Sequence, residues 1–182
     1  MKNRLIISLA VVSICSLAGA DYSEKIEASK AKCYEILDQM FFTDKTSVPY
    51  DLSIEGMVRA SEEIKFGAAE TTGWWIVRHG QHIKRVINAL EKDEDGAAAN
   101  EVRKFVERGI EERTKRLFPL IPHNVPQETI EMNYTQVAHI PRVLCHHGLR
   151  SNESNCDEIG RKMRKYAEEV IAERRKTEQP RD

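Results

Sequence analysis

The sequence lacks any hydrophobic run long enough to cross a lipid bilayer. A membrane-spanning helix needs about 20 consecutive apolar residues, whereas the run from Leu5 to Leu17 is shorter and no second run follows it. Basic residues are not in excess either, since 28 Lys and Arg stand against 29 Asp and Glu. We therefore expect neither stable membrane insertion nor binding to nucleic acid, which normally requires a basic excess on one face.

The first twenty residues have the three-part pattern of a cleaved secretory signal peptide. Lys2 and Arg4 form a positive start, the apolar run follows, and Ala18-Gly19-Ala20 has the small residues that precede signal peptidase cleavage. Removal of residues 1–20 would leave 162 of the 182 residues, in a chain that we expect to be secreted or periplasmic. Because this length is typical of one domain, we predict a single helical domain over 21–176 and a frayed tail over 177–182.

Apolar residues recur at helical spacing along most of the chain, and no strand-like alternation or internal repeat accompanies them. We therefore predict an all-α bundle of four to six helices. One helix is expected from a cap at Asp21 to near Thr43, and the next begins after Ser53. Another contains the apolar stripe from Trp75 to Leu90, and the following one runs from Ala97 to Phe118. A shorter helix begins after Pro126 and stops before Pro141, and the last helix begins with a cap at Asp157.

Cysteine is scarce, and its positions exclude covalent haem attachment, because none of the four cysteines belongs to a Cys-x-x-Cys-His sequence. Cys145 and Cys156 bracket a polar turn, and we predict that they form a disulfide, which stabilises the fold by about 3 kcal/mol in the chain-entropy model. Cys33 lies seven residues from both Ile26 and Met40 and is expected in the core. An intermolecular disulfide through Cys33 is the alternative.

The histidines show no standard metal-ligand spacing such as His-x-x-x-His. His79 and His82 are nevertheless three residues apart, hence neighbours on one helix face, and His146 and His147 directly follow Cys145. These four histidines are candidate ligands for zinc or copper, or one of them for haem iron. The alternative is that they make ordinary hydrogen bonds, with Cys145 held in the disulfide and unavailable to a metal.

The segment Val77-Arg78-His79-Gly80-Gln81 resembles the Arg-His-Gly start of the histidine phosphatase and phosphoglycerate mutase superfamily. The resemblance covers five residues. It implies an α/β fold in which the motif follows the first strand, with His79 as the phosphorylated nucleophile and Arg78 as a phosphate-binding residue. A histidine-phosphatase-like enzyme is therefore a third hypothesis for the function.

Two further features concern the surface. On a helix Trp74 lies about 100° from Trp75, and we expect Trp74 to cover the end of the core; if it is exposed, it can instead anchor a partner or ligand. Asn152 and Asn133 each begin an Asn-x-Ser/Thr sequence, which is a glycosylation site if the source is eukaryotic. Asn152 is the better acceptor because it lies in the polar turn.

Several catalytic signatures are missing as local motifs: paired catalytic acids, a nucleophile beside its base, and a glycine-rich phosphate loop. We therefore expect an exported, non-enzymatic binding or interaction protein, which contacts another protein or a small apolar ligand between its helices. A metal- or haem-binding bundle that uses the histidines is the main alternative.

Overall fold

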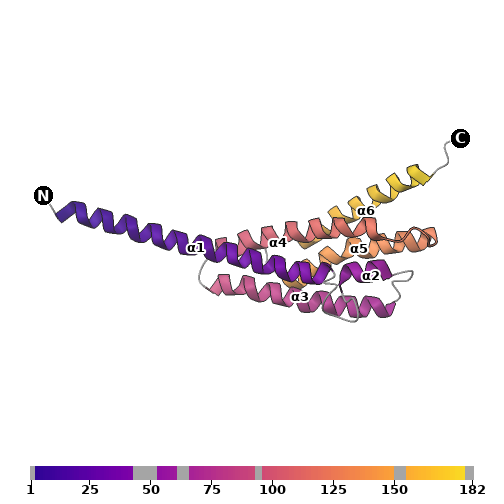
Figure 1. Ribbon diagram of the computed structural model, residues 1–182, viewed down its shortest axis with the longest axis horizontal. Helices are drawn as coiled ribbons and strands as arrows, with labels where there is room; N and C mark the ends of the chain where they lie inside the picture. Colours follow the sequence, from indigo (N-terminus) through magenta and orange to yellow (C-terminus); the bar gives the residue numbers. More distant parts are fainter. Residues whose placement is uncertain (1–2, 43–52, 61–65, 93–95, 150–154, 179–182) are drawn as a thin grey trace.

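The computed structural model describes residues 3–42, 53–60, 66–92, 96–149 and 155–178, and this part of the chain is almost entirely helical (Figure 1). Its elements, in chain order, are α1 (Asn3–Phe41), α2 (Ile54–Ala60), α3 (Phe66–Lys92), α4 (Gly96–Leu117), the 3-10 helix η1 (Phe118–Leu120), α5 (Gln127–Gly148) and α6 (Cys156–Glu178). The prediction of an all-α bundle is confirmed, and the six α-helices of the described ranges agree with the four to six predicted.

The long helices lie side by side along the longest axis of the molecule (Figure 1). α5 packs against α3, α4 and α6, while α1 packs against α3 and α4. The short α2 contacts α1, α3 and η1. The first part of α1 extends beyond the other helices at one end of the molecule, and the last part of α6 diverges from its neighbours at the other end.

The core is formed by the apolar stripes that the sequence shows. Cys33, Leu37 and Met40 of α1 are fully buried. Ile83 and Ile87 of α3 expose no more than 1% of their surface. Removing an apolar side chain of this size from water stabilises a fold by about 1.5–3 kcal/mol. The predicted core position of Cys33 is therefore confirmed, and burial raises the pKa of its thiol to about 12.

α1 begins at Asn3 and passes through Asp21 without interruption. The predicted helix start at Asp21 is therefore wrong for the full chain. No proline precedes Asp21, and Gly19 alone weakens a helix by only about 1 kcal/mol relative to alanine, so nothing local ends the helix there. Within residues 21–41, the part of α1 whose side-chain burial is described, the first core residue is Ile26.

α5 passes through Pro141 and ends at Gly148, so the predicted stop before Pro141 is wrong. A proline inside a helix removes one N–H donor and costs about 3 kcal/mol. Pro141 is buried, and α5 packs on three other helices, which offsets this cost. Cys145, one turn further along α5, is bonded to Cys156 of α6 with a Cα–Cα distance of 5.3 Å, which confirms the predicted disulfide.

α6 begins at Cys156, with Asn155 immediately before it. The backbone carbonyl of Asn155 accepts a hydrogen bond of 3.1 Å from the N–H of Ile159, so Asn155 is the residue that precedes the first helical turn. The predicted cap at Asp157 is therefore wrong by two residues. Asp157 lies instead in the first turn, where a carboxylate interacts favourably with the positive end of the helix dipole.

Two other predicted boundaries have different outcomes. Ser53 is confirmed as the start of the second helix, because its Oγ accepts a hydrogen bond of 3.0 Å from the backbone N–H of Gly56. The predicted frayed tail starts too early, since Thr177 and Glu178 are still part of α6. Residues 179–182 lie outside the described ranges.

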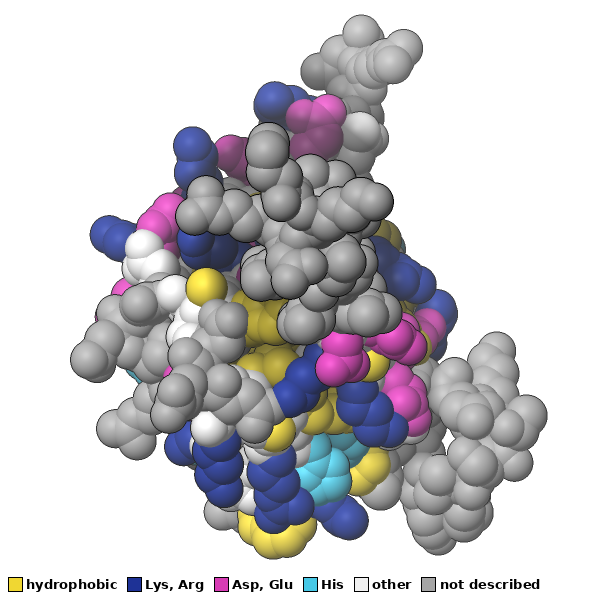
Figure 2. Space-filling view, turned by 90° about the vertical axis from the view of Figure 1, so that its left-hand side faces the viewer, with side chains coloured by type: hydrophobic (Ala, Val, Ile, Leu, Met, Phe, Trp, Pro, Cys, Tyr) yellow, Lys and Arg dark blue, Asp and Glu magenta, His cyan; other side chains and the backbone are white. Residues whose placement is uncertain are grey.

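Charged side chains of both signs lie around the end of the bundle from which α1 extends (Figure 2). Ion pairs connect α1 to α4. Lys30 Nζ lies 2.6 Å from Glu101 Oε1, and Arg113 Nη2 lies 2.9 Å from Asp38 Oδ1, while the Arg113 guanidinium is 4.3 Å from the centre of the Tyr34 ring. Among the described residues, no helix is long and apolar enough to span a membrane.

Candidate ligand-binding site

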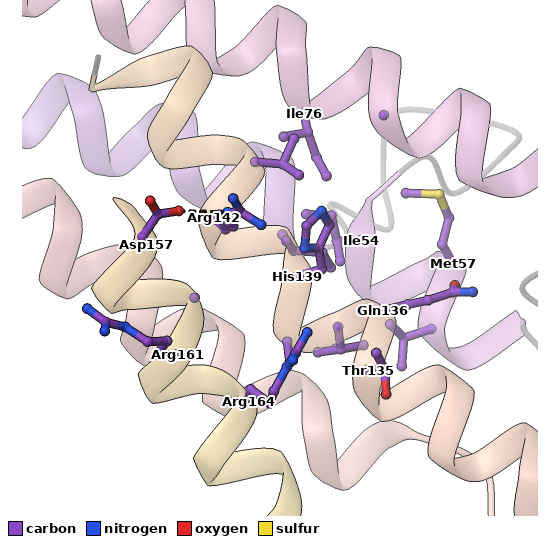
Figure 3. Close-up of a pocket in the computed structure, with 17 residues that line it drawn as sticks. Ile54, Met57, Ile76, Thr135, Gln136, His139, Arg142, Asp157, Arg161 and Arg164 are labelled. Atoms are coloured by element: carbon purple, nitrogen blue, oxygen red, sulfur yellow. Dashed lines mark hydrogen bonds and ion pairs between the residues drawn. The ribbon is translucent and has the colours of Figure 1, made fainter. Parts of the chain in front are cut away.

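A cavity of about 750 Å³ lies between α2, α3, α5 and α6 (Figure 3). The apolar part of its lining comes from these helices and includes Ile54, Met57 and Val58 of α2, Ile76 of α3, and Val137 and Val143 of α5. Small-molecule sites in proteins usually measure about 300–1,000 Å³ and combine a mainly apolar lining with a few polar groups. The cavity thus has the size and the composition of a small-ligand site.

Two glycines shape the walls of this cavity. A Cβ atom added at Gly73 of α3 would meet no atom within 4 Å, so the wall is open at this position. A Cβ atom added at Gly160 of α6 would lie 3.2 Å from the Cβ of Arg142, so α5 and α6 approach closely there. Arg142 Nε donates a hydrogen bond of 2.9 Å to Oδ1 of Asp157, and this ion pair joins the two helices beside the cavity.

The polar part of the lining is mainly cationic. Arg142, Arg161 and Arg164 face a single carboxylate, Asp157, so three positive charges stand against one negative charge. Arg142 is paired with Asp157. Within the part of the chain that the structure describes, Arg161 and Arg164 have no hydrogen-bond or ion-pair partner. Two guanidinium groups at this cavity are therefore available to an anion.

His139 of α5 lies next to these cations, and Figure 3 shows Arg164 of α6 pointing toward it. Burial lowers the pKa of His139 below its ordinary value, and repulsion from Arg142, Arg164 and His146 lowers it further. A lowered pKa keeps the imidazole neutral at neutral pH, where it offers one N–H donor and one nitrogen acceptor.

Of the four histidines predicted as metal ligands, the first two lie on α3. His79 is only 7% exposed, and its Nδ1 donates a hydrogen bond of 2.9 Å to the carbonyl oxygen of Trp75. Because a carbonyl oxygen only accepts, Nδ1 carries the proton and Nε2 is the remaining acceptor. The His82 ring is exposed, and its centre lies 6.1 Å from that of His79.

The other two predicted ligands are exposed and lie near the end of α5. His146 Nε2 is 3.7 Å from Asp157 Oδ1, while His147 packs beside Gly80 of α3. In the residues that the structure describes, no group of three or more His, Cys, Asp and Glu side chains is arranged to hold a metal ion. Cys145 belongs to the disulfide.

The resemblance of Arg78-His79-Gly80 to the histidine phosphatase superfamily does not extend to the fold. The motif lies in the middle of α3 and not after a strand, and the described residues contain no strand. The implied α/β fold is therefore wrong. Gly80 has a packing role, because a Cβ atom there would lie 3.2 Å from the Cβ of His147 and 3.3 Å from the backbone nitrogen of Gly148.

Trp74 is 73% exposed, so the expectation that it covers the end of the core is wrong. It lies on a face of α3 away from the buried stripe, which includes Ile76. Trp75 is half-buried instead, and its ring centre lies 4.2 Å from that of His79.

The two glycosylation sequences differ in what the structure shows. Asn133 lies on α5 with no exposed surface, so its amide is inaccessible in the folded protein. The helix buries this side chain because Asn133 falls on the same face as Tyr134 and Val137, which pack in the core. Asn152 lies outside the described residues.

The sequence did not reveal the cavity or its free arginines. One signal was present, since Arg161 and Arg164 are three residues apart and therefore neighbours on one helix face. Mixed charges surround them in the sequence, so their lack of partners becomes visible only when α5 and α6 are placed together.

No family model, no curated protein and no solved structure matches this chain.

Proposed function

We propose that the protein is an exported, non-enzymatic binding protein, which holds a small and largely apolar ligand in the cavity between α2, α3, α5 and α6. The observation that carries the proposal is a cavity of about 750 Å³ with an apolar wall from three helices. Water in such a cavity is easily displaced, because apolar walls give it few hydrogen-bond partners. An apolar ligand that replaces this water removes its own surface and that of the wall from solvent.

Two features of the fold support export and removal of the first twenty residues. The first part of α1 extends beyond the other helices (Figure 1), and the core residues of α1 whose burial the structure describes, from Ile26 onward, would all remain after cleavage following Ala20. The disulfide between Cys145 and Cys156 is typical of proteins that fold in an oxidising compartment.

The neutral fluorescent probe N-phenyl-1-naphthylamine tests the apolar cavity. Its emission should rise on binding to the purified protein and saturate at one probe per chain. Gly73→Leu should weaken the binding by about tenfold or more, because it adds a side chain at an open position of the wall and a tenfold change corresponds to only about 1.4 kcal/mol.

Gly96→Leu is the matched control for this experiment. A Cβ atom at Gly96 also meets nothing within 4 Å, but Gly96 lies at the start of α4 and does not line the cavity. This variant should bind the probe as the original protein does, and circular dichroism should show the same helicity in all three proteins. Absence of probe binding, or equal binding by both variants, would contradict the proposed function.

A further inference from the structure

The cavity has two chemically different sides (Figure 3). Ile54 and Met57 of α2 and Ile76 of α3 form the apolar side, whereas Arg142, Asp157 and Arg161 lie on the side toward α6. A purely apolar ligand would fill the first side and make no use of the second side, where the arginine side chains are exposed. A ligand that also carries an anionic group can contact both sides.

Arg161 and Arg164 differ from the other basic residues of α6. Every other lysine and arginine in the described part of that helix has a hydrogen bond or ion pair: Lys162 with Glu158 and Glu111, Lys165 with Glu169, Arg174 with His123, Arg175 with Glu131, and Lys176 with Glu173. The two exceptions are the two that line the cavity. The unpaired charge on α6 is thus concentrated at the proposed binding site.

We propose that the ligand is an amphipathic carboxylate with a single alkyl chain, whose carboxylate is bound by Arg164 beside His139 and whose chain lies against Ile54, Met57 and Ile76. This inference rests on the proposed function, because it needs the same cavity.

A guanidinium is suited to this head group because its planar fork of N–H donors matches the two oxygens of a carboxylate. Figure 3 shows Arg164 pointing from α6 toward α5, where His139 lies. The neutral imidazole of His139 adds one donor at the same place. Arg142 is less available to a ligand, because its Nε already donates to Asp157.

Three ligands with the same chain and different heads test the inference: dodecanoate, dodecan-1-ol and dodecyltrimethylammonium. Each is titrated below its micelle concentration against protein loaded with N-phenyl-1-naphthylamine. Dodecanoate should displace the probe at a concentration about tenfold or more below that of the alcohol, because hydrogen bonds to charged groups are the stronger ones. The cation should bind least.

Arg164→Gln should raise the dissociation constant of dodecanoate roughly tenfold to a hundredfold and leave that of dodecan-1-ol unchanged. Lys165→Gln is the matched control, since it removes one positive charge from the adjacent position of α6, and Lys165 is paired with Glu169 and does not line the cavity. It should leave the binding of both ligands unchanged.

The outcomes separate the two proposals. If the alcohol or the cation binds as tightly as dodecanoate, or if Lys165→Gln weakens dodecanoate as much as Arg164→Gln, the carboxylate inference is overturned while binding of the neutral probe still supports an apolar site. If the neutral probe itself does not bind, the proposed function fails, and the carboxylate inference fails with it.

Discussion

The contact between α3 and α5 at Gly80 and Gly148 makes a sharp prediction about two glycines of the same helix. A Cβ atom at Gly80 would lie 3.2 Å from the Cβ of His147 and 3.3 Å from the backbone nitrogen of Gly148. Those neighbours belong largely to the α5 backbone, which cannot move aside as a flexible side chain can. A Cβ atom at Gly73, two turns earlier in α3, would meet nothing within 4 Å.

The two Gly→Ala variants should therefore change the free energy of unfolding differently. Replacing glycine by alanine inside a helix stabilises it by about 1 kcal/mol, and Gly73→Ala should show this gain in full. Overpacking at a close contact costs about 1–3 kcal/mol. In Gly80→Ala this cost should cancel the stabilisation that alanine brings to the helix, and if the cost is about 3 kcal/mol the protein should be destabilised by about 2 kcal/mol. The variants should thus differ by about 1–3 kcal/mol.

Urea unfolding measures these free energies when it is followed by circular dichroism in the helix band at about 222 nm. Thermal melting gives a second measure, because 1 kcal/mol corresponds to about 2–4 °C in a domain of this size. If Gly80→Ala stabilises the protein as much as Gly73→Ala does, the close approach of α3 and α5 is refuted, and with it the packing role assigned to Gly80.

Four other predictions concern the disulfide, the free thiol, a buried histidine and the start of the chain. Reduction of the Cys145–Cys156 bond should lower the free energy of unfolding by about 3 kcal/mol, as estimated for the loop of 11 residues that it closes; unchanged urea midpoints with and without reductant would contradict this. The pKa of the Cys33 thiol is raised to about 12 by burial, so iodoacetamide at mildly alkaline pH should modify Cys33 only after unfolding, and rapid modification of the folded protein would show that Cys33 is accessible. Burial lowers the pKa of His79, so the unfolded state binds the proton more readily. The free energy of unfolding should therefore fall as the pH drops below about 6.5, by no more than about 1.4 kcal/mol per pH unit for this one proton. His79→Gln should flatten this pH dependence, and an unchanged dependence in the variant would contradict the role of His79. Amino-terminal sequencing of the protein isolated from its natural source should begin at Asp21 if residues 1–20 are removed, whereas a chain that retains Met1 would contradict export.

The sequence predicted the bundle and the disulfide because both follow from local patterns. Apolar spacing identified the stripes that contain Leu37, Ile83 and Ile87 without any knowledge of their partners. The short polar segment between Cys145 and Cys156 was enough to pair the two cysteines. Such features depend on residues that are close together along the chain.

The errors arose where packing between distant segments outweighed local preference. Pro141 disfavours a helix, but contacts of α5 with three other helices hold the helix together through it. Trp74 is the kind of side chain that is usually buried, yet the part of the chain that the structure describes leaves it 73% exposed.

The cavity could not be predicted because it depends on what is missing from its walls. It requires an open position at Gly73, a close approach at Gly160, and the meeting of α2, α3, α5 and α6 from four separate parts of the chain. Whether Arg164 has an ion-pair partner likewise depends on which acidic side chains lie near it in the fold. Because the sequence around Arg164 is rich in both acidic and basic residues, the sequence does not show this.

Nuclear Overhauser effects between dodecanoate and the methyl groups of the protein report where the alkyl chain lies, and therefore whether the ligand occupies the cavity. The end of the chain should show contacts to the methyl groups of Met57, Ile54 and Ile76, and the His139 resonances should shift near the carboxylate. Contacts confined to surface methyl groups, or no contacts at concentrations that saturate binding, would contradict a ligand in this cavity.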